Sequence, residues 1–214
     1  MNFLQGIFNA IWGTIRGIKS AARWTRNKYS SQVQAAVNPY GSCFSHCACW
    51  FLQNGAPGKF DALTPDDVSR EINGQAYQDY TRNTPGLGAW ALSKYRGRLN
   101  ELWQVQCKYI NDKLRAAGII GVAVFDTATT VDKIKTALMG GAVIVGTSPV
   151  YKGQRLGHIM LIVGYDPEEG VWWVDDPFGS FVDGYASGHI GKGDDLKVGI
   201  GDFELIRGSM SIHF

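Results

Sequence analysis

The apolar residues in the second half of the chain come in short runs separated by turn residues. Four runs, rich in Val and Ile and bounded by Gly, Pro or Asp, occupy residues 119–125, 142–147, 158–164 and 171–174. Runs of this length and composition are typical of strands that are buried in a sheet. One further helix is expected between the first two runs, at 130–139. The second half of the chain therefore predicts a sheet.

The first half of the chain has a helical pattern instead. We expect a helix from Cys43 to Gln53, ended by the turn signal that begins at Asn54, and a largely helical stretch over 87–117. Thr64 and Pro65 are residue types that open a helix, as N-cap and first helical residue. Helices followed by strands indicate an α+β fold, in which N-terminal helices pack on an antiparallel sheet.

Residues 1–29 are expected to form a separate basic amphipathic helix ahead of a domain at 30–214. Apolar residues recur there at spacings of three and four, and residues 1–60 contain six Lys or Arg but no Asp or Glu. Such a helix is compatible with binding to an anionic membrane surface, and equally with packing on the domain or on a partner chain. Because its bases follow the apolar residues, we recognise no secretory signal peptide.

Length, cysteine usage and charge narrow the class of protein. A chain of 214 residues can bury a sizeable core without covalent cross-links. Three of the four cysteines fall within seven residues, unlike a disulfide framework, so free thiols are expected. No run of eighteen apolar residues occurs, which argues against a membrane-spanning helix. The formal net charge is +2, and we expect no nucleic-acid partner and no cofactor.

Cys43 is the candidate nucleophile. It follows a turn at residues 38–41 and opens the helix expected at 43–53. Unpaired backbone N–H groups at a helix N-terminus favour a thiolate, which is the reactive form of cysteine. Cys47 and Cys49 lie further into the helix, where this effect has faded. The alternative is that these cysteines are small buried hydrophobic residues.

The helix at 43–53 also allows a zinc-binding interpretation. Cys43, His46 and Cys47 share one helix face, with Cys49 close by, so zinc binding is conceivable. Zinc sites draw ligands from two separated segments, and the sequence has no second cluster, so we expect no metal. We expect His46 on the helix surface, and His189 in a glycine-rich surface loop.

His158 stands at the mouth of an apolar strand and is the candidate base. The next strand, 171–174, ends in the acids Asp175 and Asp176. If the two strands pair as a hairpin, one of these carboxylates lies beside His158 and can orient its imidazole. Cysteine, histidine and carboxylate are the groups needed for nucleophilic hydrolysis. The alternative is that His158 has only a structural role in the strand.

Two segments of the sequence resemble one known family. Residues 157–166 read Gly-His-Ile-Met-Leu-Ile-Val-Gly-Tyr-Asp, and residues 173–180 read Trp-Val-Asp-Asp-Pro-Phe-Gly-Ser. Together they resemble the papain-like peptidases related to bacteriocin-processing (double-glycine leader) peptidases. The resemblance implies a papain-like fold, with His158 as base and Asp176, which precedes Pro177, as third member. The segment from Asn38 to Cys43 resembles the nucleophile loop of phage lysins in this family.

The resemblance also implies a role for an upstream glutamine in stabilising the oxyanion. Gln32 fits this role best, with Gln34 close behind. The implied enzyme is a cysteine hydrolase that cleaves peptide bonds, and the lysin-like loop points to peptidoglycan peptides. Such a protein is made in the cytoplasm and acts at the bacterial cell wall.

Several alternatives to this function stay open. The residues after Cys43 are not the small apolar ones that are usual in the family, and the helical region 60–117 is enlarged, so the substrate is open. A processing peptidase acting on a protein is one alternative, and a non-catalytic papain-like binding module is another. A third is a membrane-active protein that works through residues 1–29 alone.

Overall fold

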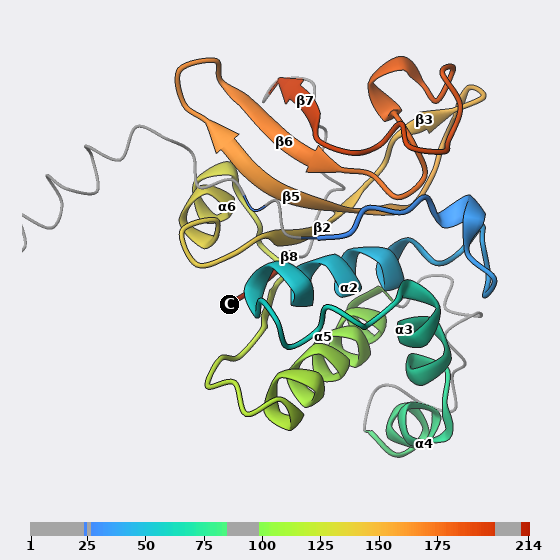
Figure 1. Ribbon diagram of the computed structural model, residues 1–214, viewed down its shortest axis with the longest axis vertical. Helices are drawn as coiled ribbons and strands as arrows, with labels where there is room; N and C mark the ends of the chain where they lie inside the picture. Colours follow the sequence, from blue (N-terminus) through green and yellow to red (C-terminus); the bar gives the residue numbers. More distant parts are fainter. Residues whose placement is uncertain (1–23, 25–26, 85–98, 200–210) are drawn as a thin grey trace, which may run out of the picture.

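The computed structural model describes residues 24, 27–84, 99–199 and 211–214. Its helices come before most of its strands and lie together on one side of the sheet, while α6 lies apart from them (Figure 1). The helices are α2 (Cys43–Gly55), α3 (Pro65–Ile72), α4 (Gln75–Asn83), α5 (Leu99–Ala116) and α6 (Val131–Ala137), with short 3-10 turns η1 (Gln32–Gln34) and η3 (Phe181–Asp183).

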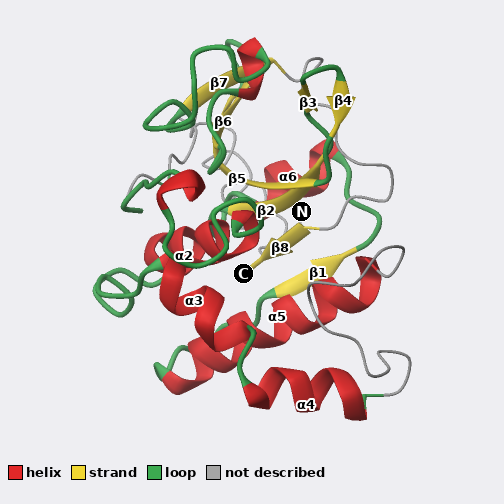
Figure 2. Ribbon diagram, turned by 90° about the vertical axis from the view of Figure 1, so that its right-hand side faces the viewer, coloured by secondary structure: helices red, strands yellow, loops and turns green. Residues whose placement is uncertain are grey.

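The main sheet has six strands in the order β1-β8-β2-β5-β6-β7, and every neighbouring pair is antiparallel. Figure 2 shows this sheet above the helical layer. Its strands are β1 (Val124–Asp126), β2 (Val143–Thr147), β5 (His158–Asp166), β6 (Val171–Asp175), β7 (Leu196–Gly199) and β8 (Ser211–His213). A separate hairpin pairs β3 (Val150–Tyr151) with β4 (Gln154–Arg155). The predicted α+β class, with helices on an antiparallel sheet, is confirmed.

Both faces of the central strands are buried, which explains why β5 is apolar along its length. Ile159, Leu161 and Val163 belong to the core cluster around α2, α3 and α5. Met160 and Ile162 belong to the cluster under α6. Successive side chains of a strand point to opposite faces, so helices on both sides bury the whole run.

Helix α2 is the centre of the helical layer. Residues 44–54 are all buried, so the helix is enclosed on all sides. It packs on β5 and α3, and the extended segment 27–31 covers a further face. Along that face the Trp50 indole donates to the carbonyl of Lys28, and Gln53 accepts from the Lys28 backbone N–H. These contacts fix the helix that begins at Cys43.

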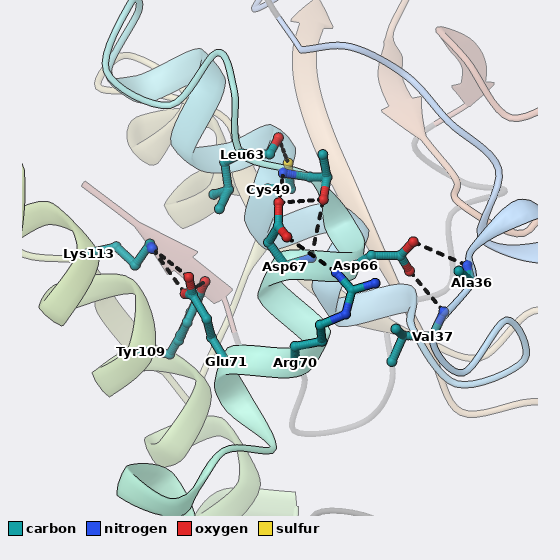
Figure 3. A network of polar contacts seen from close by, with 11 residues as sticks. Ala36, Val37, Cys49, Leu63, Asp66, Asp67, Arg70, Glu71, Tyr109 and Lys113 are labelled. Atoms are coloured by element: carbon teal, nitrogen blue, oxygen red, sulfur yellow. Dashed lines mark hydrogen bonds and ion pairs between the residues drawn. The ribbon is translucent and has the colours of Figure 1, made fainter.

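Helix α3 begins as the sequence predicts, with Pro65 as its first residue. Thr64 is the N-cap and forms a reciprocal capping box with Asp67. Asp66 accepts from the backbone N–H groups of Ala36 and Val37, at 3.2 and 2.9 Å. This clamp, drawn in Figure 3, holds the chain that leads into α2.

Helix α3 is also tied to α5. The Tyr109 hydroxyl donates to Glu71 at 2.7 Å, and the Lys113 ammonium binds the same carboxylate at 2.9 Å (Figure 3). The helical layer therefore forms one connected support for the start of α2.

The C-terminal residue Phe214 fills a slot between the two layers. Its ring stacks on Phe51 of α2, with centroids 4.7 Å apart and planes at 4°. A Cβ added at Gly55 would lie 2.0 Å from the ring, and one at Gly141 would lie 3.0 Å from it. The missing side chains of these glycines provide the slot.

Some expectations from the sequence are wrong or lie outside the described residues. The stretch 119–125 is not a buried strand, because Ile120 and Val122 are exposed and only Val124–Asp126 pairs, with β8. Helix α4 was not predicted.

Most of the helix expected at 1–29 lies outside the described residues; Trp24 and 27–29 are described and are not helical. The division into 1–29 and 30–214 stays a prediction. Among the described residues, no helix has the length and apolar character needed to cross a bilayer.

Candidate active site

Cys43 is the first residue of α2 and its side chain is half-buried. The chain reaches it through a turn in which the Gly41 N–H donates to the Asn38 carbonyl. Within the described chain, the N-cap residue Ser42 makes no side-chain bond to the first turn, and that turn holds no acid. The N–H groups of the first turn are therefore left to act on the thiol and on anything bound beside it.

His158 is the first residue of β5 and is 8% exposed. Its Nε2 lies 2.7 Å from Oδ1 of Asp176. The thiol of Cys43 is near enough to this imidazole to help raise the pKa of His158. Because Nε2 is held by the carboxylate, Nδ1 is the nitrogen left for the thiol. The structure thus brings the three predicted groups together, although they come from distant parts of the sequence.

Asp176 is completely buried directly after β6, and three donors hold its carboxylate. Besides His158, the Phe178 backbone N–H donates to Oδ1 at 2.8 Å and the Tyr185 hydroxyl donates to Oδ2 at 3.1 Å. The carboxylate therefore has a fixed orientation toward the imidazole.

The neighbouring acid, Asp175, faces a different environment. It accepts from the Asn27 side chain at 2.8 Å and from the Asp195 backbone N–H at 2.9 Å. Burial raises its pKa to about 7, against the lowering effect of these two hydrogen bonds. Asp176, rather than Asp175, contacts the imidazole, as the sequence favoured.

The net effect of the surroundings is to raise the pKa of His158. Burial alone would lower it, but the carboxylate of Asp176 and the contact with Cys43 outweigh burial and raise it to about 10. The imidazole therefore carries its second proton at neutral pH. A cation between a carboxylate and a thiol is suited to stabilise the thiolate and later to donate a proton.

The two candidate glutamines differ in their surroundings. Gln32 is 3% exposed, and its backbone N–H donates to the carbonyl of Pro177 at 2.7 Å, next to Asp176. Its side-chain Oε1 is buried and has no hydrogen-bond partner among the described residues. Gln34 is exposed and, together with His46, lines a cavity of about 410 Å³ to which neither Cys43 nor His158 contributes. The role of either residue stays a prediction.

The other three cysteines are free thiols in apolar surroundings. Burial raises the pKa of Cys47 well above its usual range, that of Cys49 to about 12 and that of Cys107 to about 11. Their thiols are therefore protonated at neutral pH. Within the described chain no group of three or more Cys, His, Asp or Glu could hold a metal ion.

His46 is buried instead of lying on the helix surface as expected, whereas His189 lies in the expected loop. His46 is 1% exposed; its Nδ1 bonds the carbonyl of Ser42 and its ring packs edge-on against Trp50. It is buried because the segment 27–31 covers that side of α2. His189 is half-buried, and its ring lies 4.2 Å from that of Phe178.

An aromatic cluster beside the imidazole was missed by sequence reasoning. The rings of Phe178, Tyr185, His189 and Tyr151 contact one another, and Phe178 also contacts His158 edge-on at 6.2 Å. These residues come from an irregular, glycine-rich stretch and from the β3–β4 hairpin. No periodic pattern marks them, so only the tertiary structure reveals that Tyr185 binds Asp176.

Comparisons with known proteins identify relatives of this arrangement. The model of the Peptidase C39-like family matches residues 33–189, a range that includes Cys43, His158 and Asp176. Among solved structures, a Bacillus anthracis protein assigned as a C39-like peptidase is similar at 15% identity and a TM-score of 0.49. The match covers 91% of this chain and 98% of that one. No curated protein matches the sequence.

Proposed function

Because the chain belongs to the Peptidase C39-like family, we propose that it is a cysteine peptidase that hydrolyses amide bonds with Cys43, His158 and Asp176. The observation that carries the proposal is the position of the His158 imidazole. It bonds the Asp176 carboxylate at 2.7 Å, and its pKa is raised in part by Cys43, the thiol at the start of α2. The papain-like α+β fold supplies the two elements that meet there, the start of α2 and the start of β5.

The chemistry is acyl transfer in two steps. The Cys43 thiolate attacks the carbonyl carbon of the scissile amide, and protonated His158 gives its Nδ1 proton to the departing amine. Water then attacks the thioester, with neutral His158 as the base that accepts its proton. Asp176 binds Nε2 throughout and keeps Nδ1 directed at the reacting atoms.

The negative charge on the carbonyl oxygen needs hydrogen-bond donors in each step. The backbone N–H of Cys43 lies in the first turn of α2 and supplies one. We assign the second to the side chain of Gln32, which is buried beside Pro177. Gln32→Ala should lower kcat about 10- to 1000-fold, whereas Gln34→Ala, at an exposed position, should leave it unchanged.

A labelling experiment tests the nucleophile without requiring a substrate. The native protein is treated with iodoacetamide near pH 6, and the rate at each cysteine is followed by peptide mass spectrometry. We expect fast, selective labelling of Cys43 and slow labelling of Cys47, Cys49 and Cys107, whose pKa values are raised by burial. The His158→Ala variant should slow labelling of Cys43. Uniformly slow labelling would show that no thiol is activated and would favour a non-catalytic binding module.

For the substrate, we propose the peptides of bacterial peptidoglycan. The lysin-like segment from Asn38 to Cys43 supports this choice, as does the excess of basic residues in 1–60, which suits the anionic cell envelope. The protein would then act at the cell wall, with residues 1–29 as a contact to anionic membrane. Release of peptides from purified sacculi, absent in Cys43→Ala, is the expected result. Cleavage of an unfolded protein but not of sacculi would indicate a processing peptidase instead.

A further inference from the structure

The turn that carries Asp176, residues 176–179, packs against a later part of the same loop. It is closed by a hydrogen bond from the N–H of Gly179 to the carbonyl of Asp176, at 3.3 Å. Gly179 has a φ of +132°, and a Cβ added there would lie 2.7 Å from the carbonyl oxygen of Gly188 and 2.9 Å from Cα of His189. Because glycine has no side chain, His189 can approach the turn closely.

His189 is hydrogen-bonded to this turn through its side chain. Nδ1 of its ring lies 2.7 Å from the carbonyl oxygen of Phe178. Since a carbonyl oxygen only accepts, the ring nitrogen is the donor. The ring also packs on that of Phe178, with centroids 4.2 Å apart. His189 therefore restrains both the backbone and the side chain of Phe178.

Phe178 in turn contacts two groups of the proposed active site. Its backbone N–H donates at 2.8 Å to Oδ1 of Asp176, the same oxygen that binds Nε2 of His158. Its ring meets the imidazole of His158 edge-on, with centroids 6.2 Å apart. A single residue thus connects His189 to the carboxylate and to the imidazole.

From these contacts we propose that His189 is a positioning residue for the carboxylate of Asp176. Its hydrogen bond to the Phe178 carbonyl keeps the Phe178 N–H aimed at Oδ1, and the carboxylate is thereby kept directed at the imidazole of His158. His189 acts through Phe178 and not on a substrate. The inference rests on the proposed peptidase function, since it assigns His189 a role in the orientation of that site.

Two substitutions separate the hydrogen bond of His189 from the packing of its ring. His189→Phe keeps an aromatic ring beside Phe178 but has no donor. His189→Asn loses the ring, but its side-chain amide can place an N–H where Nδ1 lies. A positioning role predicts that His189→Asn behaves like the wild type and that His189→Phe does not. A role in packing alone predicts the reverse.

The first readout is the rate at which iodoacetamide labels Cys43 near pH 6, which requires no substrate. A loosely held imidazole points Nδ1 at the thiol for less of the time, so it stabilises the thiolate less. We expect His189→Phe to slow the labelling about 3- to 10-fold, the equivalent of one hydrogen bond, and His189→Asn to stay within about twofold of the wild type.

The second readout is the pKa of His158, followed by NMR titration of its ring. Asp176 is the largest factor that raises this pKa. A carboxylate that is less well directed at the imidazole raises it less, so the pKa should be lower in His189→Phe than in the wild type and unchanged in His189→Asn. A loss of loop packing that leaves Asp176 in place would not move it.

His213→Phe is the matched control, because Nδ1 of His213 also lies near a carbonyl oxygen, that of Phe214 at 3.3 Å, but on β8. It should change neither readout. Every variant is first checked for native circular dichroism, and His189→Leu, which also lacks a donor, replaces His189→Phe if that protein does not fold.

Wild-type labelling and an unchanged His158 pKa in His189→Phe would overturn the inference. A His189→Asn protein that is labelled as slowly as His189→Phe would also overturn it. Slow labelling of Cys43 in the wild-type protein is a different result, because it would overturn the proposed function and the inference with it.

Discussion

His158 and Asp176 share a 2.7 Å hydrogen bond in a place that solvent scarcely reaches, with side-chain exposures of 7% and 0%. The pair joins the start of β5 to the residue that follows β6, two strands that are antiparallel neighbours. Because the bond is buried, its electrostatic effect is screened little by water and salt. The charge of Asp176 therefore dominates the chemistry of the imidazole.

Replacing that charge should shift the pH dependence of activity. In Asp176→Asn the largest factor that raises the pKa of His158 is lost, while burial, which lowers the pKa, remains. In the proposed mechanism protonated His158 releases the amine, so the alkaline limb of kcat/KM should move from well above pH 8 in the wild type to below pH 8. At pH 7.5 we expect kcat/KM to fall about 10²- to 10⁴-fold. An unchanged alkaline limb would contradict the assigned role of Asp176.

Tyr185 should act on the reaction through Asp176. Tyr185→Phe removes the hydroxyl that donates to Oδ2 and keeps the ring in the aromatic cluster. We expect a fall in kcat of about 3- to 10-fold, the equivalent of one hydrogen bond, with little change in KM. Tyr165→Phe, which changes a ring packed on Trp172 away from the site, is the matched control. Equal effects of the two substitutions would argue against a positioning role for Tyr185.

Asp175 should make the stability of the protein fall as the pH rises. Its pKa is about 7 in the folded protein and 3.8 in the reference state, so the folded form binds more protons between these values. The contribution of Asp175 to the free energy of unfolding is therefore fully present below about pH 4 and is lost toward pH 7, a change of up to about 4 kcal/mol.

The Asp175→Asn variant isolates this effect. Chemical denaturation at several pH values should show a smaller decline between pH 4 and 7 than in the wild type. The variant also loses an acceptor for Asn27, which lowers stability at every pH and leaves the slope as the diagnostic quantity. A slope identical to that of the wild type would show that Asp175 ionises normally.

The slot for Phe214 can be tested by a double-mutant cycle. Phe214→Ala removes the ring that stacks on Phe51, and we expect a loss of about 1–3 kcal/mol in the free energy of unfolding. Gly55→Ala should cost a similar amount, since its Cβ would lie 2.0 Å from that ring and displace it. The double variant should be little worse than either single one, because both remove the same contact. Additive losses would mean that the ring does not occupy the slot in solution.

Local patterns were sufficient for the central elements of this fold. The strands β2, β5 and β6 and the starts of α2 and α3 follow from apolar runs and capping residues, which act over a few positions. The stretch 119–125 misled because its apolar residues look like a buried strand, whereas Ile120 is fully exposed and only the end of the stretch pairs, with β8. Whether an apolar run is covered depends on distant segments.

The same limit applies to the site. The positions of Cys43 and His158 could be predicted because each begins an element with a clear pattern. His46 was misplaced because its cover, the segment 27–31, comes from outside its helix. Tyr185 was missed because it lies in a loop, and no periodic sequence pattern marks the residues of a loop.

The segment 27–32 binds the far end of the sheet through hydrogen bonds from Asn27 to Asp175, from Tyr29 to the carbonyl of Asp176 and from Gln32 to the carbonyl of Pro177. A ribosome must therefore finish Pro177 before the first part of the chain can close. At 5–20 residues per second, the interval between the synthesis of Cys43 and that of Pro177 is on the order of ten seconds. Throughout that interval the nascent thiol has neither its imidazole nor its carboxylate in place. A chain truncated before Pro177 therefore lacks the assembled Cys43, His158 and Asp176 group.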